Sequence, residues 1–175
     1  MKKISKPSFT EFAMYYETYI NLINDSSILD QLKTSAKEIT ALFKSLDEER
    51  LMKPYAEGKW SMKDILMHLI DAERVFVYRA MRFARLDKMP VPFFDENEFA
   101  QNANANKINT TKLLKEFNAC RSLTIAFFNN LTVSQMQVTG IASNFTMSVR
   151  ACAWIILGHE LHHLKIIRER YLSMM

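Results

Sequence analysis

The sequence has few of the residues that interrupt helices. Only three glycines and four prolines occur among its 175 residues, while apolar residues make up 49% of the chain. All-β folds need many glycine- and proline-rich turns, and disordered chains carry far fewer apolar residues. The composition therefore argues against both classes, and the length is enough for one domain with a substantial hydrophobic core.

Cysteines and long apolar runs are also scarce. The two cysteines, Cys120 and Cys152, fall inside helical patterns, so we expect buried free thiols in a reducing compartment. No window reaches the roughly 18 consecutive apolar residues of a membrane span. Lys6, Pro7 and Glu11 interrupt any signal-peptide core after the basic start. These absences predict a cytoplasmic protein without a membrane partner.

The charge is mixed rather than of one sign. The net charge of +4 comes from 23 Lys and Arg against 19 Asp and Glu. The basic residues are scattered among acidic ones and form no stripe with interleaved aromatic residues, which is the pattern of nucleic-acid binding. We therefore do not expect nucleic acid as a partner.

Four segments show the 3.6-residue apolar spacing of long amphipathic helices. Ser27, Ser61 and Ser148 stand where N-caps belong, just before the first, second and fourth segments. The predicted helices cover about residues 28–46, 62–80, 113–128 and 149–171. Together they predict an all-α four-helix bundle, which we place at residues 27–175 of a single domain.

The remaining segments predict little regular structure. Ser8 and Glu11 match a capping box, so a short aromatic helix through about Ile23 is expected in the N-terminal extension, residues 1–26. Pro90 and Pro92 are predicted to end the second helix and to begin a long connection, with one short helix near residues 93–99. Residues 138–145 read as a turn region, and no strand is predicted.

The four histidines lie in only two of the predicted helices. His159 and His163 are four residues apart, so their side chains share one face, with Cβ atoms about 5–6 Å apart. His68 lies in the second helix, where alone it would be read as an ordinary core residue. Three imidazoles from two packed helices can hold one divalent ion and leave a position open for water or substrate. The His159 and His163 pair, together with His68, therefore favours a catalytic metal site with a small-molecule substrate.

Three polar residues adjoin the predicted ligands. His162 projects about 100° away from His163, which favours an exposed residue or one that supports the ligands from outside. Asp64 and Asp71 lie one turn before and after His68, and either could orient its free ring nitrogen. Asp71 is preferred because Asp64 also caps the helix, and a surface ion pair is the alternative for Asp71.

Residues 159–163 also match H-E-x-x-H, the signature of zinc proteases. Such a protease takes its third ligand downstream, and the twelve residues after His163 contain no histidine. We therefore expect the match to be accidental and predict no peptidase activity. Glu160 is left as a candidate base near the metal, with a solvent-facing helix residue as the alternative.

Several separated motifs resemble the DinB superfamily. They are KWS at 59–61, HLIDAER at 68–74, FDEN at 94–97, SVR at 148–150 and GHELHHL at 158–164. The resemblance covers about residues 28–172. It implies a four-helix bundle with a long connection between the second and third helices, often a homodimer, and a divalent metal, commonly zinc or nickel. Carried over residue by residue, the ligands fall on His68, His159 and His163.

The resemblance implies less about activity. Some members transfer a low-molecular-weight thiol such as bacillithiol to an electrophile, and a related branch contains mycothiol-dependent isomerases. A thiol is a stronger acid than water by several pK units, so an ion at an open position favours thiol chemistry. We therefore predict a metal-dependent thiol S-transferase, with a metal-dependent hydrolase or a non-catalytic metal-binding dimer as alternatives.

Apolar residues also predict a homodimer. In the final helix, residues 154–157 form an uninterrupted apolar run, and a short N-terminal element carries four aromatic residues. They are Phe12, Tyr15, Tyr16 and Tyr19. One bundle of this size is expected to bury only part of this surface, and an apolar remainder usually marks a partner surface.

Overall fold

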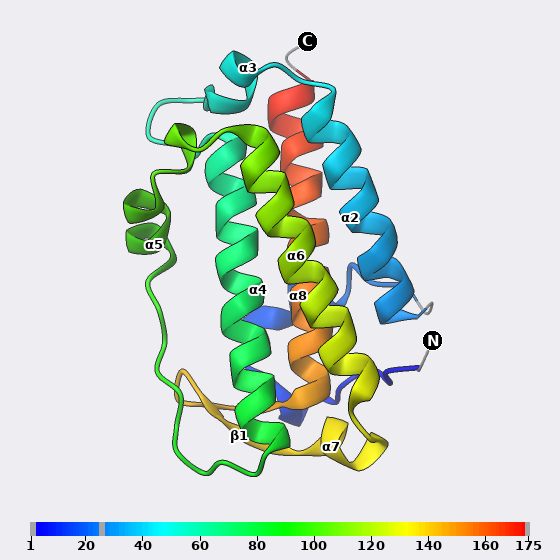
Figure 1. Ribbon diagram of the computed structural model, residues 1–175. Coiled ribbons are helices and arrows are strands. Elements are labelled where there is room, and N and C mark those ends of the chain that lie inside the picture. The colour runs from blue at the N-terminus through cyan, green and yellow to red at the C-terminus, as the bar shows by residue number, and fades with distance from the viewer. Residues whose placement is uncertain (1–2, 25–26, 174–175) are drawn as a thin grey trace.

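The computed structural model describes residues 3–24 and 27–173. Within these residues, four long helices form a bundle (Figure 1). They are α2 (Ile28–Lys44), α4 (Met62–Ala84), α6 (Thr110–Asn130) and α8 (Val149–Ile166), which a π-helical turn, η4 (Ile167–Leu172), extends. The predicted all-α four-helix bundle is confirmed. Within the described ranges, no helix is both long and apolar enough to cross a membrane.

The order of helix directions explains the long connection. In Figure 1, α2 and α8 run upward, whereas α4 and α6 both run downward and pack side by side. Because α4 and α6 are parallel, the chain must return along the whole bundle between them. Residues 85–109 make this return and carry a short helix, α5 (Glu96–Ala103), and a 3-10 turn, η3 (Ala105–Lys107). Both the long connection and its short helix match the sequence prediction.

Serine caps begin three of the long helices, as predicted. Ser27, Ser61 and Ser148 each accept a hydrogen bond from a backbone N–H three residues on, at 3.4, 3.0 and 3.0 Å. The end of α4 differs from the prediction, because the helix stops at Ala84, well before Pro90. Leu86 has a φ of 62°, and this left-handed residue closes the helix by donating to the Phe83 carbonyl.

A β-hairpin occupies the segment that was predicted as a turn region without strands. Strands β1 (Thr139–Ala142) and β2 (Phe145–Ser148) pair antiparallel and lead directly into α8. The two turn residues, Ser143 and Asn144, both have positive φ, 52° and 68°, as a type I′ turn requires. The strand prediction failed because Ser-Asn is a much weaker signal for this turn than Asn-Gly.

The N-terminal segment is less helical than predicted. It consists of two 3-10 turns, η1 (Phe9–Glu11) and η2 (Met14–Tyr16), and one short helix, α1 (Glu17–Ile20). Phe12 interrupts the helix because its backbone is extended, with φ −159° and ψ 159°. This break lets the segment wrap around α8 and bury Phe12, Tyr16 and Ile20 in the core.

Close contacts hold the N-terminal segment against α8. A Cβ on Gly158 would lie 2.3 Å from the Tyr19 carbonyl oxygen, so only glycine permits this approach. Trp154 donates from its indole nitrogen to the Ile4 carbonyl at 3.3 Å, and Arg150 donates to Glu11 at 2.7 Å. Residues 154–157 are all buried within the chain, because α4 and α2 pack against α8 as well as the N-terminal segment. The apolar run of α8 is thus covered from within the chain.

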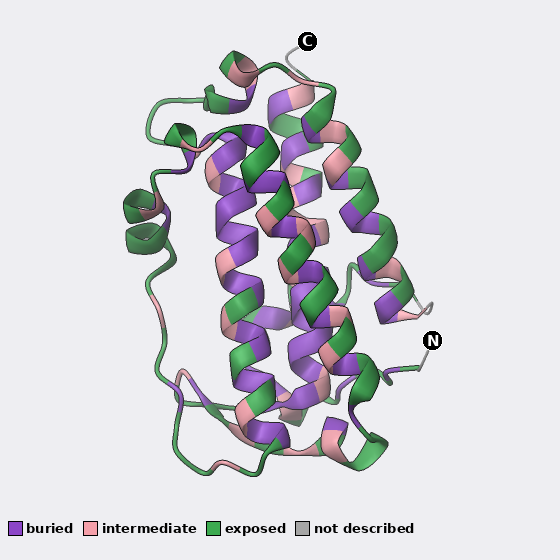
Figure 2. Cartoon of the chain, in the orientation of Figure 1, coloured by how far each residue is buried: buried purple, intermediate pink, exposed green. Residues whose placement is uncertain are grey.

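A buried arginine ties the four long helices together. Arg121 of α6 pairs with Glu73 of α4 at 2.9 Å and with Glu160 of α8. Its guanidinium also donates to the Leu32 carbonyl of α2 at 2.8 Å. Figure 2 shows that buried residues cover most of α4 and the first half of α8, whereas α6 keeps an exposed face. Two further short helices, α3 (Glu48–Met52) and α7 (Val133–Gln137), lie at opposite ends of the bundle (Figure 1).

Candidate metal centre

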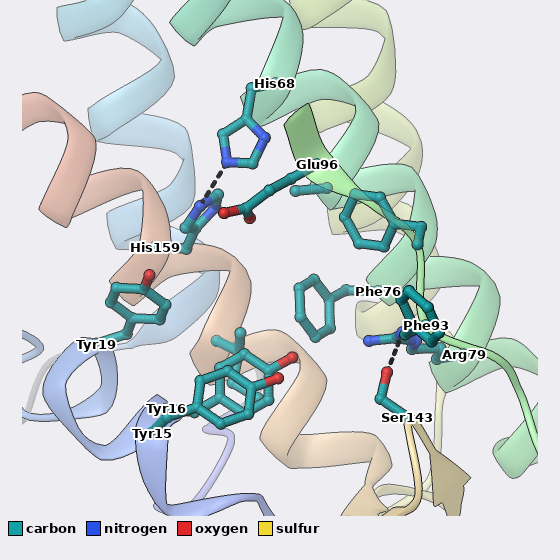
Figure 3. A pocket seen from close by; sticks show the side chains of 13 residues that line it. Tyr15, Tyr16, Tyr19, His68, Phe76, Arg79, Phe93, Glu96, Ser143 and His159 are labelled. Atoms are coloured by element: carbon teal, nitrogen blue, oxygen red, sulfur yellow. Dashed lines mark hydrogen bonds between the residues drawn. The ribbon is translucent and has the colours of Figure 1, made fainter. Parts of the chain in front are cut away.

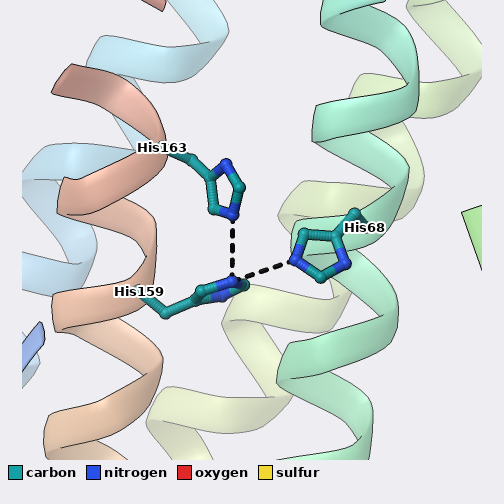
Figure 4. Close-up of side chains that lie close together, drawn as sticks. All are labelled: His68, His159 and His163. Carbon is teal, nitrogen blue, oxygen red and sulfur yellow. Dashed lines mark hydrogen bonds between the residues drawn. The ribbon is translucent and has the colours of Figure 1, made fainter. Parts of the chain in front are cut away.

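Three of the four histidines meet between α4 and α8 (Figure 4). The Nε2 atom of His159 lies 2.9 Å from that of His68 and 3.0 Å from that of His163. One ligand atom from each of the three residues lies within 4.8 Å of those of the other two. The i,i+4 spacing on α8 brings two rings together, and the packing of α4 against α8 brings the third. The structure therefore joins the three residues that the sequence singled out.

Burial keeps these imidazoles neutral at physiological pH. It lowers the pKa of His68 to about 4 and, with the neighbouring imidazoles, that of His163 to about 3. Burial, followed by the charges of His163 and His68, holds the pKa of His159 well below its ordinary value. Neutral imidazole is the form that binds metals. The cluster is therefore ready to ligate without first losing protons.

The donor set fits a divalent transition metal. A neutral Nε2 either donates one hydrogen or accepts one, so Nε2 of His159 cannot satisfy both of its neighbours. A cation among the three nitrogens would use all three lone pairs at once. Nitrogen donors of this kind suit zinc, nickel and related ions. The Trp60 ring covers one side of the cluster, with its centroid 4.8 Å from that of His68.

A cavity of about 170 Å³ reaches the cluster from the other side. His68 and His159 lie at one end of it, and side chains from α4, α8, the N-terminal segment, the 93–96 loop and the hairpin turn form its walls (Figure 3). Its aromatic lining comprises Tyr15, Tyr16, Tyr19, Phe76, Phe93 and Phe94. The space suits a small apolar molecule, since a cavity of about 150 Å³ can hold benzene.

Comparison with known proteins agrees with this architecture. A family model described as the DinB superfamily matches residues 31–167, which is most of the chain and includes all three histidines. The chain belongs to the DinB superfamily.

Two relatives of this DinB protein share its length. A protein from Oceanobacillus iheyensis is 28% identical over 144 residues, covering 80% of this chain and 81% of the relative. A protein from Halalkalibacterium halodurans is 26% identical over 147 residues, covering 81% and 82%. Each is named a "putative metal-dependent hydrolase".

Two solved structures share the fold of this DinB protein. YfiT from Bacillus subtilis, described as "a probable metal-dependent hydrolase with an unusual four-helix bundle topology", has a TM-score of 0.73 at 16% identity. That match covers 97% of this chain and 93% of YfiT. A mycothiol-dependent maleylpyruvate isomerase has a TM-score of 0.63 at 11% identity, covering 87% of this chain and 62% of the isomerase. At sequence identities this low, the similarity to these two structures shows a shared fold alone.

The predicted supporting residues of the DinB protein lie outside the cluster. Asp71 forms an ion pair with Arg74 at 3.5 Å, and no hydrogen bond joins it to His68 among the described residues. Asp64 completes the cap of α4 by accepting from the Ser61 N–H at 2.9 Å. His162 is half-buried, and its ring packs against Tyr19.

Glu160 does not face solvent, so that alternative is wrong. It is 1% exposed and accepts a hydrogen bond from Arg121, because it faces the interior of the bundle, into which the Arg121 side chain of α6 extends. The cysteines are also removed from the cavity. Cys152 is buried as predicted, whereas Cys120 is half-buried, and burial raises their pKa values to about 12 and about 11. Both thiols of the DinB protein therefore stay protonated at neutral pH.

Several cavity residues were missed by reasoning from the sequence. The N-terminal tyrosines and Glu96 come from short helices and turns, whose position against the bundle no periodicity predicts. Arg79 could have been found, because His68, Ala72, Phe76 and Arg79 follow helical spacing along one face of α4. A charged residue in this otherwise apolar stripe is the available signal.

Proposed function

We propose that this protein is a divalent-metal-dependent enzyme that transfers a low-molecular-weight thiol to an electrophile. In this proposal His68, His159 and His163 hold the ion, with zinc or nickel as the candidates. The observation that carries it is the convergence of three neutral imidazoles at the end of an aromatic cavity. The names of the relatives support metal dependence, and the mycothiol-dependent isomerase of the same fold supports thiol chemistry.

The thiol would have to come from a co-substrate, because neither cysteine of the chain lines the cavity. A bound divalent ion supplies positive charge that lowers the pKa of a thiol beside it. In the reaction the thiol loses its proton, its sulfur bonds to the electrophilic carbon, and the leaving group departs with its bonding electrons. Glu96 is the carboxylate that lines the cavity, and it points inward from the side of the histidines (Figure 3). We assign it the role of taking up the proton.

Hydrolysis is the second candidate, and the names of the two relatives favour it. The same ion would then activate water for attack on an ester or amide. Glu160, the base that the H-E-x-x-H match suggests, is held by Arg121 in a buried ion pair. Hydrolysis would therefore also depend on Glu96, so the base does not distinguish the two reactions. We prefer thiol transfer because a thiol is a stronger acid than water.

We expect the metal-loaded protein to accelerate the reaction of L-cysteine with monochlorobimane at pH 6.5. A free thiol of pKa about 8.5 is roughly 1% ionised at this pH, so full ionisation in the site gives up to about a 100-fold advantage. The advantage should shrink as the pH rises towards 8.5, because the free thiol then ionises unaided. Thiol consumption, followed by bimane fluorescence, measures this rate.

Two comparisons make the assay decisive. Chelation of the metal should remove the acceleration, whereas His162→Ala should retain it, because His162 lies outside the cluster. Turnover of 4-nitrophenyl acetate that ignores added thiol would put hydrolysis first. Inactivity in both assays, with metal bound, would favour a non-catalytic metal-binding protein.

We also propose that the protein forms a homodimer. The surfaces that first suggested it are largely buried within the chain, but Phe9 of η1 and Phe145 of the adjacent β2 are 64% and 50% exposed. Such exposed apolar residues often mark a partner surface. We expect light scattering at micromolar concentration to give twice the chain mass, and a Phe9→Ser/Phe145→Ser variant to give the chain mass. A wild-type monomer under these conditions would contradict the proposal.

A further inference from the structure

Two arginines are buried among the residues that the structure describes, and their surroundings differ. Arg121 is paired with two carboxylates, Glu73 and Glu160. Arg79 is only 1% exposed, yet no Asp or Glu in the described part of the chain forms an ion pair with it. Burial of a charge without a counter-ion is strongly unfavourable. An anion from outside the chain would therefore compensate the buried charge of Arg79.

Neutral groups hold the Arg79 guanidinium in place but leave it incompletely bonded. Its Nη2 donates to the Ser143 hydroxyl at 2.9 Å and to the Pro92 carbonyl at 3.2 Å. Its Nε is buried without a hydrogen-bond partner. The Phe76 ring lies 5.2 Å from the guanidinium carbon. These contacts orient the guanidinium, and its unpaired Nε–H, on a planar cation, is suited to a carboxylate oxygen.

Arg79 lines the same cavity as the histidine cluster, at its opposite end (Figure 3). It lies eleven residues after His68 on α4, which places the two Cα atoms roughly 16 Å apart along the helix axis and within about 20° of the same face. Helical side chains lean towards the N-terminus, so Arg79 leans towards His68. The cavity thus runs between a candidate reaction centre and an unpaired cation.

We propose that Arg79 binds the carboxylate of a substrate whose apolar body fills the aromatic cavity. This deepens the proposed function, because it assigns a substrate class to the same cavity. A monocarboxylate matches the single charge of the guanidinium, and the tyrosine and phenylalanine walls match an aromatic or branched apolar body. Ser143, at the turn of the hairpin, is then a positioning residue for Arg79.

The test compares binding of 3-phenylpropanoate with that of its neutral analogue, 3-phenylpropanamide, to the full chain. Isothermal titration should show the carboxylate binding about 10- to 100-fold more tightly, the range expected for hydrogen bonds between charged partners. Arg79→Met should remove this preference without lowering the melting temperature, since it removes a buried unpaired charge. Arg82→Met, on the same helix but outside the cavity, should retain the preference.

The titration is repeated with a chelator, to test whether carboxylate binding at Arg79 depends on a metal bound by the histidines. Because the preference depends on Arg79, it should persist without metal, and it should persist even if the thiol assay fails. Equal binding of acid and amide by the wild type would overturn the inference without recourse to any variant. A preference that survives Arg79→Met, or that disappears on chelation, would also overturn it, since the carboxylate would then bind elsewhere.

Discussion

Replacing His159 with alanine is expected to weaken divalent-metal binding by at least about 100-fold, because loss of even an outer partner of a ligand costs 10- to 100-fold. His159 should be the most sensitive of the three, since its Nε2 contacts both of the other rings. His68→Ala and His163→Ala should also weaken binding, each by a smaller factor than His159→Ala. Bound zinc or nickel after dialysis, with competition against a chromophoric chelator, measures the effect.

His162 provides a matched control for this experiment. It is adjacent to His163 and also lies on α8, but it is not part of the cluster. His162→Ala should therefore keep the wild-type metal content and affinity. Full occupancy in all three ligand variants would refute the metal site, and equal losses in the His162 variant would show that the effect is not specific to the cluster.

Replacing Arg121 with methionine is expected to cause the largest loss of stability, about 3–5 kcal/mol in the free energy of unfolding. Glu73 and Glu160 would remain buried, at 3% and 1% exposure, without their shared cation. The hydrogen bond to the Leu32 carbonyl would be lost as well. For a chain of this length the melting temperature should fall by roughly 10 °C. Calorimetry and urea unfolding both measure the change.

Two further variants show how much of the loss in the free energy of unfolding comes from leaving charges buried and unpaired. Arg74→Met removes two ion pairs of an exposed arginine, with Glu116 at 2.8 Å and with Asp71 at 3.5 Å, and should cost about 1 kcal/mol. Replacing Glu73, Glu160 and Arg121 together by methionine should recover most of the stability, because no unpaired charge is then buried. If Arg121→Met matches Arg74→Met, the buried cluster contributes no more than a surface pair.

Local signals in the sequence predicted the parts of the fold that local interactions decide. Serine caps and apolar spacing located the long helices, because a cap bonds within three residues and a helix face repeats every turn. The hairpin escaped prediction because both residues of its turn are left-handed without a glycine. Asn144 is a weak signal for a left-handed turn residue, and Ser143 is none.

The site was predictable to the extent that it depends on spacing within one helix. His159 and His163 are neighbours in any α-helix that contains both. His68 could be added to them because it is the remaining histidine within a predicted core stripe. The environment of Glu160 depends instead on which helix packs against its face of α8. Arg121 lies 39 residues away on α6, and no spacing rule connects the two. Tertiary packing therefore determines the environment of residues such as Glu160, for which the sequence-based interpretation was wrong.

The tyrosine wall has a consequence for how the protein can change its specificity. Tyr15, Tyr16 and Tyr19 lie before residue 31, where the family match begins, whereas the three histidines lie within it. Part of the wall proposed to contact the substrate thus lies outside the matched stretch, whereas Phe76 and Arg79 lie within it together with the histidines. The tyrosines of this segment are therefore the positions at which we would redesign the proposed selectivity, because they lie apart in the sequence from the three histidines.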